Sequence, residues 1–268
     1  MKSFDIVTKN ARLRAARFTP ALPRSGMPAV VFLHEALGSI GQWKAFPRQL
    51  CEALGCEGFV YDRRGHGASD PLDAPRRIDF YHEECETLRT LLAEQHIERP
   101  VLFGHSDGGT IALAFATHFP GEARAVVAEA AHVFIEDVTL AGIRAARDAF
   151  ERGGLREKLE RYHGSNTDGV FKAWADTWLD PRARDWHMLD DLRSVSDPVL
   201  VVQGEDDQYG SIEQVRAIEQ RCGGPTRSLL LSSCGHVPHL EKRDTVIEAV
   251  VSFLQNVVFE SRGMHFKG

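Results

Sequence analysis

Short apolar runs alternate with helical patterns along most of the chain. The runs are typical of buried strands and occur at 29–33, 59–61, 101–103, 125–128, 199–202 and 228–231. Between them, apolar residues at helical spacing predict helices at 43–54, 80–95, 111–116 and 243–257. Residues 2–18 alternate loosely between polar and apolar, which predicts two antiparallel edge strands. This order predicts the α/β class, with a mostly parallel central sheet flanked by helices on both faces.

One block interrupts the alternation of strands and helices. Residues 133–194 carry helical patterns but no convincing strand, and they hold three of the four tryptophans. We therefore expect a helical lid inserted between a first part of the core domain at 1–132 and a second part at 195–268. The polar end of the chain, 260–268, is expected to fray.

Composition and charge narrow the classes of function. The formal net charge is −6 for 268 residues and no basic stripe is visible, so nucleic acid is not an expected partner. No apolar run reaches membrane-spanning length, and the first ten residues lack the apolar core of a signal peptide. Five cysteines without C-x-x-C spacing suit reduced thiols better than a disulfide framework. We expect a cytoplasmic monomer or homodimer that binds a small molecule and no membrane.

The stretch 99–119 carries the strongest functional signal. Its apolar run enters the sequence GHSDG at 104–108 and then continues as a helix. Glycines on both sides of Ser106 remove side chains that would clash in a tight turn from strand to helix. This is the setting in which G-x-S-x-G becomes a nucleophile elbow. The N-terminus of the helix that follows offers free N–H groups to a developing anion.

A serine hydroxyl is a weak nucleophile and needs a general base that is itself oriented by a carboxylate. The pair Asp206 and Asp207 follows one of the last two predicted core strands, and His236 follows the other. The order Ser, Asp, His along the chain is the order associated with the elbow. We predict Ser106 as nucleophile and His236 as base and then acid. Asp207 is predicted to orient His236, with Asp206 as the rival.

The carboxyl ends of parallel strands meet at one edge of a sheet, and sites form there. Several polar residues directly follow predicted strands. We expect them to share this edge: His34, Asp62, Ser106, His132 and Asp207.

Five motifs together resemble the α/β-hydrolase superfamily across nearly the whole chain. They are FLHEALGSIGQW at 32–43, YDRRGHGASD at 61–70, GHSDGG at 104–109, GEDD at 204–207 and GHVPHLE at 235–241. The resemblance implies the α/β-hydrolase fold, and its G-x-x-D and G-H patterns fall on Asp207 and His236. It also implies an oxyanion hole made by the N–H groups of Asp107 and Ala36, with Glu35 as the alternative to Ala36.

The chain departs from the family pattern at two places. Glu35 stands where the family usually has glycine, and a carboxylate directed inward would repel an anionic intermediate. We expect Glu35 to point away or to pair with Arg63 or Arg64, and we expect these arginines to hold loops together through salt bridges. The second departure is the sequence QYG at 208–210, because the family has a proline shortly after the aspartate.

Several residues near these motifs are candidates for contact with substrate. They are Glu35, His132, Phe134, Trp174, Trp178 and Val237. His132 fits equally well a hinge histidine bonded to the backbone. The aromatic residues of the 133–194 block, which include Phe171, fit helix packing as well as an apolar pocket. We expect one or two of them to face the substrate.

Two further features favour structural explanations. His236 and His239 have H-x-x-H spacing, but the sequence places no third ligand near them and Pro238 breaks a helix, so no metal is expected. Cys234 is expected to be a small buried residue rather than a second nucleophile.

These residues predict a cofactor-free serine hydrolase. Ser106 attacks a carbonyl, His236 transfers the proton, and water resolves the acyl-enzyme, with a carboxylic ester as the default substrate. The resemblance also allows a carbon–carbon bond hydrolase that opens vinylogous diketones, or a perhydrolase. A ligand receptor that keeps the three residues but turns over slowly is an alternative from another class. Serine at the nucleophile position argues against haloalkane dehalogenases and epoxide hydrolases, which have aspartate there.

Overall fold

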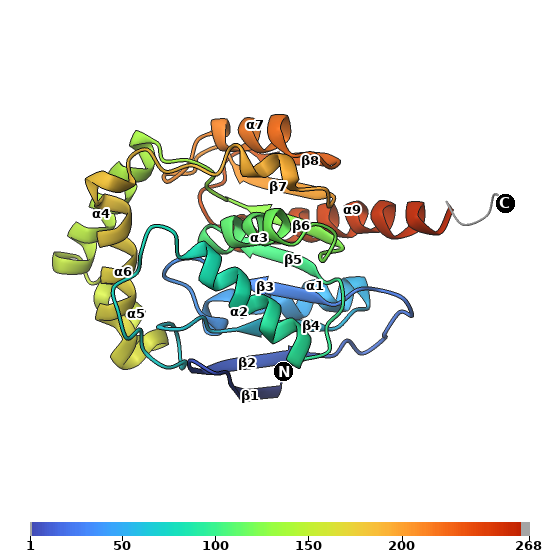
Figure 1. The fold of residues 1–268 in the computed structure, drawn as a ribbon, viewed down its shortest axis with the longest axis horizontal. Coiled ribbons are helices and arrows are strands. Elements are labelled where there is room, and N and C mark those ends of the chain that lie inside the picture. The colour runs from blue at the N-terminus through green and yellow to red at the C-terminus, as the bar shows by residue number, and fades with distance from the viewer. Residues whose placement is uncertain (1, 264–268) are drawn as a thin grey trace.

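The computed structural model describes residues 2–263, in which eight strands form one sheet (Figure 1). The strands are β1 (Lys2–Val7), β2 (Arg12–Phe18), β3 (Val30–Leu33), β4 (Gly58–Tyr61), β5 (Val101–His105), β6 (Ala125–Glu129), β7 (Val199–Gly204) and β8 (Thr226–Leu231). Their order across the sheet is β1-β2-β4-β3-β5-β6-β7-β8. β1 pairs antiparallel with β2, and β2 with β4, whereas the other pairs are parallel.

The central strands are apolar because helices cover both faces of the sheet. Every residue of β3, β5, β6 and β7 is buried, so these strands show continuous apolar runs rather than alternation. β1, at the edge, is mostly exposed. The sequence predictions of these strands and of the antiparallel pair within 2–18 are confirmed.

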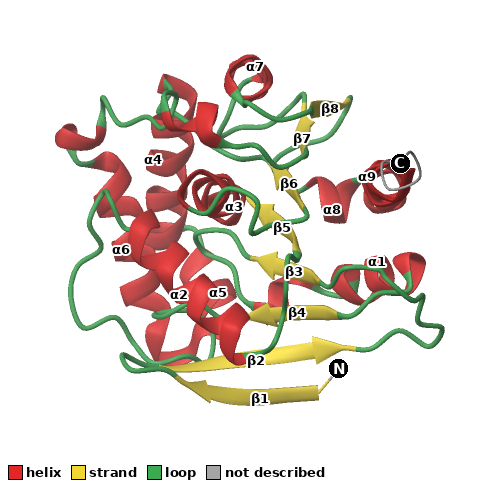
Figure 2. Cartoon of the chain, turned by 45° about the vertical axis from the view of Figure 1, so that its right-hand side comes forward, coloured by secondary structure: helices red, strands yellow, loops and turns green. Residues whose placement is uncertain are grey.

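The helices flank the sheet in two layers (Figure 2). They are α1 (Phe46–Leu54), α2 (Tyr81–Glu94), α3 (Asp107–His118), α4 (Asp137–Arg152), α5 (Leu155–His163), α6 (Thr167–Leu179), α7 (Ile212–Arg221), α8 (Pro238–Glu241) and α9 (Arg243–Gly263). The 3-10 helices are η1 (Ile40–Trp43), η2 (Gly164–Asn166), η3 (Pro181–Ala183) and η4 (Asp191–Ser194). One hydrophobic core joins α2, α3 and α7 to one face of the sheet, and a second joins α1 and α9 to the other face.

Helices α4, α5 and α6 lie together beside the sheet, between β6 and β7 in the sequence (Figure 1). They contact one another, and α4 and α6 contribute side chains to a pocket that also contains Ser106. The expected absence of strands from 133–194 holds, apart from a single bridge between Phe134 and His187. No helix in the described part of the chain combines the length and apolar character that a membrane span requires.

Two helix boundaries differ from the sequence prediction. The helix expected at 43–54 begins at Phe46, because a 3-10 turn ends at Trp43 and Lys44 adopts a φ of 54°. Pro47 is suited to the first turn of α1, where its missing N–H leaves no hydrogen bond unmade. The last helix, α9, continues to Gly263, so the predicted fraying at 260–263 is wrong, and 264–268 lie outside the described residues.

The turn from β5 into α3 depends on two glycines. A Cβ atom at Gly104 would lie 2.0 Å from the carbonyl oxygen of Gly108. A Cβ atom at Gly108 would lie 1.9 Å from the carbonyl oxygen of Leu33 in β3. Both neighbours are backbone atoms of the central sheet or its elbow, which cannot rotate away. The close approach of α3 to the sheet therefore requires glycine at both positions.

Gly108→Ala should destabilise the protein by about 3 kcal/mol or more, because the added methyl group overlaps the backbone of β3. Gly169→Ala is the matched control. Gly169 is an exposed residue of α6 with no atom within 4 Å of its built Cβ, so alanine there should be neutral or add up to about 1 kcal/mol. Urea unfolding of the two variants measures both effects, and equal stabilities would contradict this account of the elbow.

Candidate active site

Ser106 lies at the elbow in a strained backbone conformation. Its φ is 52° and its ψ is −115°, a region that residues with a side chain rarely adopt. The Ser106 N–H donates a hydrogen bond of 2.8 Å to the carbonyl of Glu129, at the end of the neighbouring strand β6. The elbow thus holds Ser106 at the carboxyl end of β5, one residue before α3 begins.

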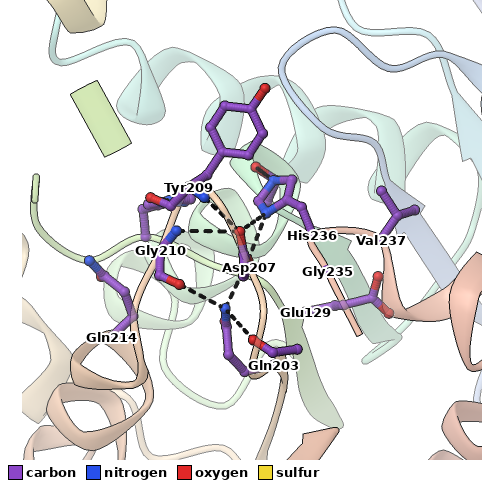
Figure 3. Close-up of polar contacts among 12 residues, drawn as sticks. Glu129, Gln203, Asp207, Tyr209, Gly210, Gln214, Gly235, His236 and Val237 are labelled. Carbon is purple, nitrogen blue, oxygen red and sulfur yellow. Dashed lines mark hydrogen bonds and ion pairs between the residues drawn. The ribbon is translucent and has the colours of Figure 1, made fainter. Parts of the chain in front are cut away.

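Ser106, His236 and Asp207 form one hydrogen-bonded chain, which we call the Ser–His–Asp chain. The Ser106 hydroxyl lies 2.9 Å from Nε2 of His236. Nδ1 of His236 donates to the Asp207 carboxylate, with distances of 2.9 Å to Oδ1 and 2.8 Å to Oδ2 (Figure 3). Because a carboxylate only accepts, Nδ1 carries the proton and Nε2 is free to accept the serine proton.

Asp207 is held in place by the loop that follows β7. Its carboxylate accepts hydrogen bonds from the N–H of Tyr209 at 2.7 Å and from Nε2 of Gln203 at 2.8 Å (Figure 3). Burial raises the pKa of Asp207, but the hydrogen bond and charge of His236 lower it further, and the net pKa is below the ordinary value. Asp206 is exposed, and its backbone N–H donates to Cys234. The structure therefore brings Asp207, and not Asp206, to His236.

Burial lowers the pKa of His236, but Asp207 more than offsets this effect. The hydrogen bond to Asp207 and the negative charges of Asp207, Glu35 and Glu129 raise the pKa of His236 above its ordinary value of 6.5. Nε2 of His105 also lies 2.7 Å from the carbonyl oxygen of His236, which anchors the backbone of the loop after β8.

The loop after β3 supplies the second possible donor of an oxyanion hole. Ala36 and Asp107 both line the pocket beside Ser106, and no acceptor for either N–H is present within residues 2–263. The loop is fixed by His34, whose Nδ1 donates to the Glu35 carbonyl at 2.7 Å and whose Nε2 accepts from the Arg63 N–H at 3.0 Å. Two backbone N–H groups therefore face the space beside the serine.

Asp107 introduces a second buried carboxylate next to Ser106. It is compensated by Arg63 at 3.0 Å, by Arg76 at 3.2 Å and by the Tyr81 hydroxyl at 3.3 Å. Arg63 is fully buried and also pairs with Glu84 at 3.4 Å. Arg64 pairs with Asp73 at 3.0 Å. The expected loop-holding role of Arg63 and Arg64 is confirmed.

A mostly apolar pocket opens onto Ser106 and His236 and encloses about 560 Å³, part of it open to solvent. Its lining residues are Glu35, Ala36, Leu37, Tyr81, Ser106, Asp107, Thr110, His132, Phe134, Ile135, Thr139, Ile143, Trp174, Trp178, Tyr209 and His236. Three predicted aromatic residues face it, which is more than the one or two expected. Phe171 does not, because it stacks on Phe150 with ring centroids 3.9 Å apart.

Two predictions about this pocket are wrong. The Glu35 carboxyl does not pair with Arg63 or Arg64 and does not point away, since both arginines bind other carboxylates and Glu35 lines the pocket. Val237 is absent from the lining, because the chain turns into α8 at that point and the Val237 N–H donates to Glu241 at 3.1 Å.

His132 does what both of its interpretations required. It lines the pocket, and its Nε2 lies 3.0 Å from the carbonyl oxygen of Tyr209. Burial and the nearby His236 lower the pKa of His132, so it stays neutral at neutral pH. Cys234 is buried as expected, and burial raises its thiol pKa to about 11, which makes it a poor nucleophile.

A second buried cluster of titratable groups lies next to His236. Candidate ligand atoms of His105, Glu129 and His239 lie within 4.8 Å of one another. The expectation that His239 has no such neighbours is therefore wrong, because these neighbours come from β5 and β6. Nδ1 of His239 donates to Glu129 at 2.5 Å, and His105 contacts the His236 carbonyl. The contacts describe a hydrogen-bond network that supports the loop bearing His236.

The comparison with known proteins was made against families, curated proteins and solved structures. The sequence profile of the Alpha/beta hydrolase family matches residues 30–249, which is most of the chain. The chain belongs to the α/β hydrolase family.

Two curated members of the α/β hydrolase family illustrate its range. The chain is 27% identical over 217 residues to a 2-hydroxy-6-oxo-2,4-heptadienoate hydrolase of Pseudomonas putida, covering 74% of this chain and 75% of that protein. It is 25% identical over 264 residues to a 2-hydroxy-6-oxononadienedioate/2-hydroxy-6-oxononatrienedioate hydrolase of Cupriavidus pinatubonensis, covering 87% and 88%. Among solved structures, the proline iminopeptidase of Mycobacterium smegmatis superposes with a TM-score of 0.76 at 20% identity over 97% of this chain and 100% of that chain.

Sequence reasoning missed several pocket residues of this α/β hydrolase. Tyr209 had a signal, because it lies in the segment where the family pattern has a proline. Tyr81, Thr110, Thr139 and Ile143 had none. They lie on helices whose pocket-facing side is set by packing rather than by periodicity.

The His236 pKa should lie above 6.5 in the wild type and fall below it in Asp207→Asn, because burial then acts without the compensating carboxylate. Titration of the imidazole nitrogens by NMR measures both values. Asp206→Asn removes an exposed neighbouring carboxylate and should leave the His236 pKa within a few tenths of a unit. An unchanged pKa in Asp207→Asn would contradict the assignment of the partner.

Proposed function

We propose that this protein is a cofactor-free serine hydrolase that cleaves a carboxylic ester of a small molecule. The observation that carries the proposal is the continuous Ser–His–Asp chain, with contacts of 2.9 Å and 2.8 Å, at a strained elbow on the floor of an apolar pocket. Nucleophile, base and orienting carboxylate are thus all supplied by side chains.

In this mechanism the Ser106 hydroxyl attacks the ester carbonyl while Nε2 of His236 takes its proton. Asp207 stabilises the imidazolium and keeps its Nδ1–H directed at the carboxylate. The N–H groups of Asp107 and Ala36 hold the oxyanion, a contribution of about 3 to 4 kcal/mol per donor in related sites. His236 then protonates the leaving alcohol, and water attacks the acyl-enzyme with His236 again as base.

The helices between β6 and β7 are proposed to act as the lid of this enzyme, over a core domain made of 1–132 and 195–268. Support comes from Phe134, Ile143 and Trp174, which belong to the 133–194 block and line the pocket above Ser106. Five free cysteines suit a cytoplasmic location.

Ester hydrolysis is favoured over the carbon–carbon cleavage of the two named relatives by the charge of the pocket. Those relatives are named for dienoate and dienedioate substrates, which carry carboxylates. Here the arginines nearest the serine, Arg63 and Arg76, are both engaged by Asp107. A substrate carboxylate would meet Glu35 and no cation that lines the pocket. A perhydrolase would use the same residues, and a receptor would stall after about one turnover.

Wild-type enzyme should hydrolyse nitrophenyl esters with steady turnover, and Ser106→Ala should lower kcat by about a thousandfold or more. The acyl length that gives the highest kcat/KM reports the depth of the pocket. A ring-fission diketone belongs in the same panel. Turnover of the diketone alone would move the assignment to carbon–carbon hydrolysis, a single burst would favour the receptor, and full activity of folded Ser106→Ala would refute Ser106 as nucleophile.

Asp207→Asn should lower kcat about 10⁴-fold, because the imidazole loses the partner that fixes its tautomer. Asp206→Asn should change it less than threefold, since this side chain is exposed. In the wild type kcat/KM should rise with pH through a midpoint above 6.5, because only neutral His236 accepts the serine proton and its pKa is raised. Steady-state kinetics between pH 5 and 9 measure both effects, and the reverse ranking of the two variants would show that Asp206 is the orienting residue.

A further inference from the structure

Glu35 is an unpaired carboxyl group in a pocket where the other acidic and histidine side chains are engaged. Asp107 binds Arg63 and Arg76, His236 lies in the Ser–His–Asp chain, and His132 contacts the Tyr209 carbonyl. The Glu35 carboxyl has neither a hydrogen bond nor an ion pair with any described residue, although it lines the pocket. A carboxyl group without a structural partner beside the reacting serine is available to a ligand.

The loop holds Glu35 in this position through its backbone. The Glu35 carbonyl accepts from the Gly38 N–H at 3.1 Å and from the Arg63 guanidinium at 3.1 Å. A Cβ at Gly38 would lie 2.8 Å from Cγ of Glu35, so glycine at this position leaves room for the Glu35 side chain. The orientation of Glu35 is therefore built into the loop that also carries Ala36.

The Glu35 charge acts on groups inside the pocket. After burial, the negative charge of Glu35 is the next cause that raises the pKa of the Tyr209 hydroxyl to about 12. The same charge contributes to the raised pKa of His236. Burial raises the pKa of Glu35 itself, as expected for a carboxylate that lacks a cation.

The charges around the pocket do not balance Glu35. Arg63 and Arg76 offset Asp107 and Glu84, and the orienting Asp207 faces a histidine that is neutral in the resting state. Ionised Glu35 then adds a second uncompensated negative charge. A cationic group is the ligand that removes this cost, since a paired, hydrogen-bonded charge is stable where an isolated one is not.

We propose that Glu35 is the specificity-determining residue of this pocket, and that the substrate is an ester carrying an ammonium group that the Glu35 carboxylate binds. The inference rests on the proposed ester hydrolysis. It places the ammonium group within reach of the loop that carries Ala36, and it selects against esters that carry a carboxylate.

Two matched series of esters test the proposal, one for each side of the scissile bond. The acyl series is ethyl ε-aminohexanoate, ethyl heptanoate and monoethyl pimelate. The alcohol series is dimethylaminoethyl, isopentyl and carboxyethyl butanoate. Within each series the compounds have similar shape and differ in charge, and the acid released at pH 7 is followed by titration.

The wild type should prefer the ammonium ester to its neutral counterpart by at least about 10-fold in kcat/KM in one of the two series, and should discriminate still more strongly against the anionic ester. Glu35→Gln keeps the shape of the side chain and removes its charge, so these ratios should collapse toward one. Glu205→Gln, the same change at an exposed position, should keep the wild-type ratios. Turnover without charge preference, or a preference that survives in Glu35→Gln, would overturn the proposal.

Binding separates a failure of this inference from a failure of the proposed hydrolysis. Trp174 and Trp178 line the pocket, so their fluorescence reports ligands bound to the Ser106→Ala variant. Hexylammonium should bind more tightly than hexanol or hexanoate, and adding Glu35→Gln should abolish the difference. If no ester is hydrolysed but hexylammonium shows this preference, the proposed reaction fails and the ammonium site stands. Equal affinities for the three ligands refute the site whatever the turnover.

Discussion

The close approach of helix α3 to the central sheet is the constraint on which the rest of the site depends. With hydrogen atoms in place of side chains at Gly104 and Gly108, the helix begins directly after β5 and its backbone reaches the carbonyl of Leu33. This contact forces Ser106 into a positive φ and leaves the N–H of Asp107 at the start of the helix. The strain is sustained because the elbow is packed between β3 and β6 and cannot relax without separating α3 from the sheet.

The elbow also creates an electrostatic problem, which the surrounding loops solve. Asp107 is buried one residue after the serine, and a buried carboxylate requires compensation. Arg63 and Arg76 provide it, and Arg63 also bonds the carbonyl of Glu35. One guanidinium thereby ties the elbow to the loop that carries Ala36, so the two N–H groups beside Ser106 keep a common geometry. Because both arginines are used in this way, they are not available to a ligand, and the charge presented to the pocket is that of Glu35.

The support for His236 comes from behind the sheet edge as well as from Asp207. His105 lies at the end of β5 and contacts the His236 carbonyl, while the Glu129 carboxylate at the end of β6 binds His239. These buried contacts fix the loop between β8 and α9, which no regular sheet contact would hold. The position of the imidazole therefore depends on three strand ends at once, which explains why the elements must assemble before the Ser–His–Asp chain exists.

The sequence by itself determined the strands, their parallel arrangement and the three residues Ser106, His236 and Asp207. Apolar runs identify buried strands, and the GHSDG turn and the later Asp and His follow those strands directly, so a parallel sheet brings them to one edge. Tertiary structure alone decided where the side chains of the loops and helices point. Glu35 faces the pocket because Asp107 and Asp73 take the arginines it was expected to bind, and Phe171 packs on Phe150 while Trp174 lines the pocket. Competition for partners among residues distant in sequence leaves no local pattern, and it settles which groups a substrate meets.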